Sequence, residues 1–176
     1  MSSKPPYQPV LNDQTPLYKS SIVGNYVNYL KSSGKMDIDA LLRCCNLNPI
    51  DINDEGYFLN QEQIDEFHRC LDERLEDPDI SYKVGLHALQ MKSTGTVMQY
   101  GLQFITPATM YKAMDRVYPK WARGHVSRIT IIGKNRARIS VTTLPGLQER
   151  PFQCENRRGI FEAIGKVHTG RPAKVT

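Results

Sequence analysis

The spacing of the hydrophobic residues changes near residue 125, and this change limits the fold more than any other feature of the chain. Before it, apolar residues recur every three or four positions, as on one face of a helix. After it they alternate with polar residues, first over 129–131 and then, beyond a turn, over 137–141. The alternation predicts a β-hairpin with strands 126–132 and 137–143, one face on the core and the other in water. We therefore expect an α+β domain over residues 17–176, with a helical N-terminal half packed on a small antiparallel β-sheet.

Capping residues divide the N-terminal half into separate helices. Asn60, followed three residues later by Gln63, has the spacing of a capping box and predicts the start of the clearest helix. Thr106 before a proline predicts another helix start, because Thr suits the N-cap and Pro the first turn. Asn48 before a proline predicts the end of an earlier helix, since the residue before Pro avoids the helical conformation. A last helix is expected over about 154–168.

The two ends of the chain carry further expectations. Four prolines predict a flexible arm over residues 1–16. Residues 172–176 are predicted to be a strand that completes the sheet, because a lone hairpin is only marginally stable. The chain is then expected to be cut from a longer protein, before an effector module.

The composition fits a chain that buries a core and does not span a membrane. Of the 176 residues, 40% are hydrophobic and 23% are charged. No uninterrupted apolar run approaches the ~18 residues of a membrane span, and the polar N-terminus lacks the apolar segment of a secretory signal. We expect a cytoplasmic location.

The net charge of +5 is distributed unevenly along the chain. Residues 1–119 carry a net charge of −4, whereas residues 120–176 carry +9. Such asymmetry is one feature of nucleic-acid-binding proteins. There is no run of five like charges, however, and the arginines of the hairpin, such as Arg128 and Arg138, are expected to face water. A nucleic-acid-binding regulator that uses the basic C-terminal third is therefore the alternative hypothesis.

The cysteines and histidines predict no metal site. The chain has four cysteines: Cys44, Cys45, Cys70 and Cys154. They are expected to be reduced and structural, because a chain of this length without a signal peptide rarely needs a disulfide framework. No Cys-x-x-Cys couple is present, although a site assembled through space from Cys and His residues stays open. His68 lies on an apolar helical stripe and is expected to be structural.

Catalytic signatures are missing from the sequence, and we expect no enzyme. There is no G-x-S-x-G, no H-E-x-x-H and no phosphate-binding P-loop. The carboxylates of the helix after Asn60 fall on its outward face. Cys154, near the start of the last helix, could be a reactive or ligand-contacting thiol.

Two segments together form a candidate ligand site. Aromatic and methionine side chains gather over 98–121, and the last helix begins with free amides and an arginine that could fix a polar or anionic end. A small apolar or amphipathic ligand is expected between them, in which case Arg157→Ala would abolish binding and leave the melting temperature nearly unchanged. The alternative is that these residues are plain core. The candidates are Tyr100, Phe104, Tyr118, Trp121, Phe152, Cys154, Asn156 and Arg157.

Five segments of the chain, 18–23, 59–65, 79–85, 106–111 and 151–159, carry a resemblance to a known family. Their order resembles the N-terminal input domains of bacterial signalling proteins. These domains precede histidine kinase, nucleotide cyclase or diguanylate cyclase modules, and they are distantly similar to the superfamily of vinyl-reductase-like and haem–nitric-oxide-binding domains. The resemblance implies an α+β sensory domain without chemistry of its own, followed by an effector domain.

The same resemblance bears on cofactors. Haem-binding members of the superfamily use a proximal histidine together with a Tyr-x-Ser-x-Arg motif, which this sequence lacks. We therefore expect a colourless protein without haem or another cofactor. A homodimer is left open.

Overall fold

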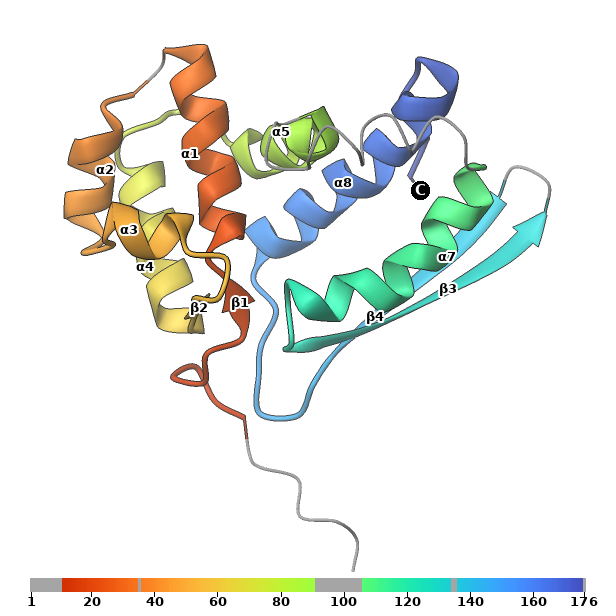
Figure 1. The fold of residues 1–176 in the computed structure, drawn as a ribbon, viewed down its shortest axis with the longest axis horizontal. Coiled ribbons are helices and arrows are strands. Elements are labelled where there is room, and N and C mark those ends of the chain that lie inside the picture. The colour runs from red at the N-terminus through yellow and green to blue at the C-terminus, as the bar shows by residue number, and fades with distance from the viewer. Residues whose placement is uncertain (1–10, 35, 91–105, 134–135, 176) are drawn as a thin grey trace, which may run out of the picture.

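The computed structural model describes residues 11–34, 36–90, 106–133 and 136–175, which form a mixed α+β fold (Figure 1). The predicted α+β class is thereby confirmed. In chain order the elements are β1 Tyr18–Lys19, α1 Ser21–Ser33, α2 Ile38–Cys44, α3 Pro49–Asn53, β2 Phe58–Leu59, α4 Gln61–Asp72, α5 Ile80–His87, the 3-10 helix η1 Ala88–Gln90, α7 Pro107–Val117, the 3-10 helix η3 Tyr118–Lys120, β3 His125–Gly133, β4 Arg136–Thr143 and α8 Pro151–Thr169.

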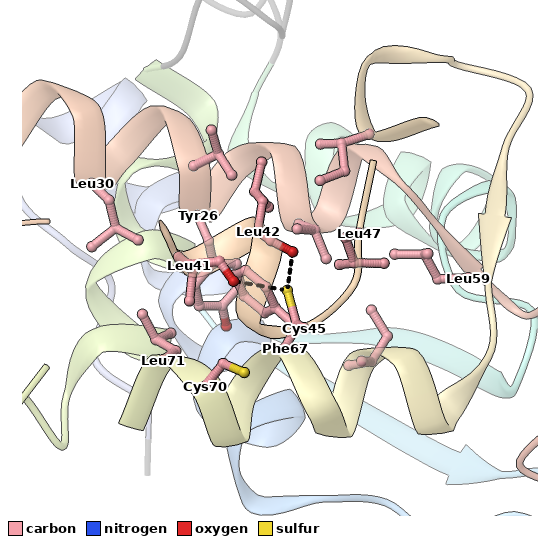
Figure 2. Packing of buried hydrophobic residues seen from close by; sticks show 14 of the residues in the cluster. Tyr26, Leu30, Leu41, Leu42, Cys45, Leu47, Leu59, Phe67, Cys70 and Leu71 are labelled. Carbon is pink, nitrogen blue, oxygen red and sulfur yellow. Dashed lines mark hydrogen bonds between the residues drawn. The ribbon is translucent and has the colours of Figure 1, made fainter. Parts of the chain in front are cut away.

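The N-terminal helices surround their own hydrophobic core. Helices α1, α2 and α4 contribute side chains to it, and the short antiparallel pair β1–β2 closes one end. Figure 2 shows Tyr26 of α1 and Phe67 of α4 within this cluster, and their rings meet edge to face with centroids 5.5 Å apart. Fully buried members include Leu30, Leu41, Leu59 and Leu71.

The helix starts follow the predicted caps. The Asn60 side chain accepts a hydrogen bond from the Gln63 N–H at 2.9 Å, and the Gln63 side chain accepts one from the Asn60 N–H, so the capping box before α4 is confirmed. The Thr106 hydroxyl caps α7 by accepting from the Thr109 N–H. The helix predicted to end by Asn48 does so, because α2 ends at Cys44, and Asn48 in addition caps the start of α3, where Pro49 is the first helical residue.

The predicted hairpin is confirmed as the antiparallel pair β3–β4. Ile129 lies opposite Ile139, and the buried side chain of Ile129 alternates with exposed Arg128 and Thr130. Its buried face is covered by α7, one of the helices predicted before residue 125, and also by α8, which was not predicted there. This second core contains Leu89, Met110, Met114, Ile129, Phe161, Ala163 and Ile164.

The strand predicted over 172–176 is wrong for residues 172–175, and residue 176 lies outside the described residues. These residues form no strand, and in the described part of the chain the larger sheet has two strands. The Ala173 N–H donates to the Glu162 carbonyl oxygen at 3.1 Å, so the chain after α8 folds back onto that helix. Packing of β3 against α7, and of Ile129 in one hydrophobic cluster with Phe161 and Ile164 of α8, supplies the support that a third strand was expected to give.

The predicted N-terminal arm is described only from residue 11. From there it contacts the domain: the Asp13 carbonyl oxygen accepts from the Gln61 N–H at 2.9 Å, and the Asp13 carboxylate pairs with Arg150 at 3.2 Å. Residues 11–16 are therefore attached to the ends of α4 and α8 rather than forming an arm. No helix among the described residues is long and apolar enough to cross a bilayer.

Cys44 and Cys70 form a disulfide, so the prediction of reduced cysteines is wrong for this pair. The bond joins the end of α2 to α4, where the two Cα atoms are 6.1 Å apart. Cys45 is a buried thiol that donates to the Leu41 carbonyl oxygen at 3.2 Å (Figure 2), and Cys154 is an exposed thiol. Disulfides are typical of oxidising compartments, and the cytoplasmic location stays a prediction.

We expect reduction of this disulfide to lower the free energy of unfolding by about 2–4 kcal/mol, because closing a loop between cysteines 26 residues apart restricts the unfolded chain. Urea unfolding with and without a phosphine reductant measures the change. Cys44→Ser should show the same loss without reductant, and Cys154→Ser should behave as the wild type. Equal stability of the oxidised and reduced chains would contradict the assignment.

Candidate functional site

A cavity of about 220 Å³ lies where the N-terminal core meets α8 and the start of β3. Its walls come from both halves of the chain, including α1, α4, η1, η3 and α8. An engineered protein cavity of ~150 Å³ holds benzene, so this one has room for a somewhat larger molecule. The described lining is Tyr18, Ser21, Ile22, Asn25, Tyr26, Ile64, His68, Ala88, Leu89, Tyr118, Trp121, Ala122, His125, Phe152, Gln153, Asn156, Arg157 and Ile160.

The segment around Trp121 reaches the cavity because its backbone is bonded to the N-terminal strand. The Trp121 carbonyl oxygen accepts from the Lys19 N–H at 2.8 Å, and the Arg123 N–H donates to the Leu17 carbonyl oxygen at 2.9 Å. Ala122, between these two bonds, forms a bridge with Tyr18. This pairing fixes Trp121 and Ala122 as one wall of the cavity.

His68 and Phe152 form another part of the wall as a stacked pair. Their ring centroids are 3.6 Å apart and the planes are tilted by 11°. Burial lowers the pKa of His68 to about 3, so the imidazole is neutral at physiological pH. His68 is thus a buried aromatic wall residue, in line with the structural role that the sequence predicted.

Arg157 is a buried cation whose charge is already compensated. Its side chain is only 7% exposed, its Nε donates to the Tyr118 hydroxyl at 2.9 Å, and its Nη1 lies 2.6 Å from the Glu149 carboxylate. Burial raises the pKa of Tyr118, so the phenol keeps its proton. The hypothesis that Arg157 fixes an anionic ligand therefore loses its basis, because Glu149 occupies that role.

His125 is the buried polar residue of the cavity that lacks hydrogen-bond partners. It is 3% exposed, and neither ring nitrogen has a partner among the described residues. Burial, together with the nearby charge of Arg157, lowers the pKa of His125 and favours the neutral ring. A neutral imidazole carries one donor and one acceptor, and leaving both unpaired in the interior costs about 1–3 kcal/mol per group.

The amide side chains of the lining are engaged in the fold. Gln153 donates to the Gln61 side-chain oxygen at 3.0 Å, and that oxygen also accepts from the Tyr18 hydroxyl at 2.6 Å. Asn156 donates to the Ser81 carbonyl oxygen at 3.1 Å. These bonds connect β1, α4, α5 and α8 around the cavity and hold its polar rim in place.

Five of the eight candidate residues lie on this one cavity: Tyr118, Trp121, Phe152, Asn156 and Arg157. Cys154 does not; it is exposed on another face of α8, which begins at Pro151 and not near 154 as predicted. Tyr100 and Phe104 lie outside the described residues.

The sequence reasoning missed His125 as a cavity residue. A signal was present, because the alternation that points Ile129 inward extends back through Ser127 to His125.

Neither a metal site in the described residues nor a known relative assigns a further role to these side chains. The described residues contain no group of three or more His, Cys, Asp or Glu side chains placed to hold a metal ion. Comparison with known proteins gave no matching family model, no similar curated protein and no similar solved structure.

Proposed function

We propose that the chain is a non-catalytic sensory input domain that binds a small ligand in the cavity and thereby biases a downstream effector. The observation that carries the proposal is the cavity itself, largely apolar, with a few polar groups at its wall, as in small-molecule sites.

The position of the cavity suggests how binding reaches an effector. An occupant touches α1, α4 and α8, so it favours one spacing of these elements over another. The chain after α8 is bonded back to that helix through Ala173 and Glu162. A shift of α8 would therefore move the segment that leads to a following module.

The nucleic-acid-binding alternative has less support, because several basic residues of the C-terminal third are engaged within the fold. Arg150 pairs with Asp13 and Asp65, and Arg157 pairs with Glu149. Arg158 pairs with Glu155, and Arg123 lies over the Phe58 ring. These side chains do not add to a free basic surface of the kind that phosphate contacts need.

A cavity-filling variant tests the proposal. Benzene is expected to raise the melting temperature of the wild type in a saturable way, because it binds the folded state alone. In Ala122→Leu the added side chain occupies the cavity, and the benzene effect should disappear. Ala113→Leu makes the same substitution at an exposed position of α7, and benzene should still raise the melting temperature of this variant. An equal benzene effect in all three proteins, or none in the wild type, would contradict ligand binding in the cavity.

A further inference from the structure

We infer that the cavity selects an uncharged molecule that carries a hydroxyl group, bound with that hydroxyl on His125. The inference rests on the proposed ligand-binding function and adds the chemical class of the ligand. It follows from three properties of the described lining: its volume, its balance of charge and the unpaired imidazole.

The volume sets the size of the ligand. Scaled from benzene in a cavity of ~150 Å³, about 220 Å³ accommodates roughly six to ten non-hydrogen atoms. Aromatic and aliphatic side chains, among them Tyr26, Trp121 and Ile160, supply most of the wall. The body of the ligand is therefore apolar and about the size of one substituted ring.

The charge balance excludes ions. Arg157 is the permanent cation of the described lining, and it is neutralised by Glu149 at 2.6 Å. A carboxylate ligand would have to compete with Glu149 for Arg157. An ammonium ligand would lie near the positive charge of Arg157 and would find no carboxylate in the described lining to pair with. Either ion would lose its hydration without a free counter-charge, which is costly in an apolar site.

The unpaired imidazole selects the polar group. The neutral ring of His125 presents an N–H donor on one nitrogen and an acceptor lone pair on the other. A hydroxyl both donates and accepts, so it can bond to whichever nitrogen faces the cavity, whereas a carbonyl only accepts. A hydroxyl ligand thereby pairs one of the two ring nitrogens and removes that part of the cost of leaving His125 unpaired.

Four probes with the same ring and different head groups test this inference. Cyclohexanol, cyclohexane, cyclohexanecarboxylate and cyclohexylamine are titrated into the full chain at neutral pH, and binding is followed by calorimetry. We expect cyclohexanol to bind with a Kd at least tenfold lower than that of cyclohexane, and the two ions to show no saturable binding. If the cavity offered no hydrogen-bond partner, cyclohexane would bind more tightly than cyclohexanol, because the hydroxyl would lose its hydrogen bonds to water without replacement.

His125→Phe keeps an aromatic ring and removes both nitrogens, so cyclohexane should then bind at least as tightly as cyclohexanol. A measurement on the wild type does not require that His125→Phe folds. The ¹⁵N resonances of the His125 ring should shift on addition of cyclohexanol and should not shift on addition of cyclohexane.

The outcomes separate the two proposals. Equal binding of cyclohexanol and cyclohexane, unmoved His125 resonances, or tighter binding of either ion would overturn the hydroxyl class and leave ligand binding in the cavity standing. No binding of any of the four probes, together with no benzene effect, would overturn both.

Discussion

Gly85→Ala is expected to destabilise the protein by about 3 kcal/mol, the upper end of the usual cost of overpacking. A Cβ atom on Gly85 would lie 2.0 Å from the Asn156 carbonyl oxygen, and one on Gly159 would lie 2.2 Å from the Tyr82 carbonyl oxygen. Both obstacles are backbone atoms, so α5 and α8 would have to move apart. Gly159→Ala should destabilise the protein by a similar amount. Because Asn156 and Ile160 line the cavity, a displacement of α8 should also weaken benzene binding.

Gly24→Ala is the matched control, because Gly24 also lies within a helix, α1. A Cβ atom there would be 3.7 Å from its nearest neighbours in Ile52, an ordinary contact. The substitution should therefore be neutral or gain up to about 1 kcal/mol from the better helix propensity of Ala. Urea unfolding of the three variants measures these differences. If Gly85→Ala proved as stable as Gly24→Ala, the close approach of α5 and α8 would be wrong.

Arg157→Ala is expected to lower the free energy of unfolding by about 3 kcal/mol, because it breaks the ion pair of a buried arginine with the half-buried Glu149 and leaves that carboxylate uncompensated. Glu149 would lose its counter-charge and the Tyr118 hydroxyl its donor. The sequence-based hypothesis of a nearly unchanged melting temperature assumed that Arg157 was free to meet a ligand.

Arg158→Ala provides the comparison one residue along the helix. Its ion pair with Glu155 is 2.9 Å long, but both side chains are about two-fifths exposed, so the loss should stay within about 1 kcal/mol. Thermal and urea unfolding of the two variants side by side give the comparison. Equal stability of Arg157→Ala and Arg158→Ala would show that the Arg157–Glu149 pair is not the buried contact described above.

Local chemistry made parts of the fold predictable. The capping box at Asn60 and Gln63 and the cap at Thr106 act within one helical turn, so the sequence alone identifies them. The hairpin was predictable because alternation needs only neighbouring residues. The Cys44–Cys70 bond and the separate core over the hairpin depend on packing between distant segments, and no local pattern records that packing.

The candidate site was predictable to the extent that its residues share a helix face. Phe152, Asn156 and Ile160 recur every four positions and line the cavity together. Cys154 lies two positions after Phe152, which turns it away by about half a turn, so nearness in sequence was misleading. His125 enters through the strand and comes close to Arg157 only in the folded chain.

The most direct test of ligand binding uses Trp121, the single tryptophan of the chain, which lines the cavity. Its fluorescence, excited where benzene does not absorb, is recorded while benzene is added to the wild type and to Ala122→Leu. We predict a saturable change in the Trp121 emission of the wild type, at the benzene concentrations that raise its melting temperature, and no saturable change in Ala122→Leu. A response that grows linearly without saturation, or that is the same in both proteins, would contradict the cavity as a ligand site.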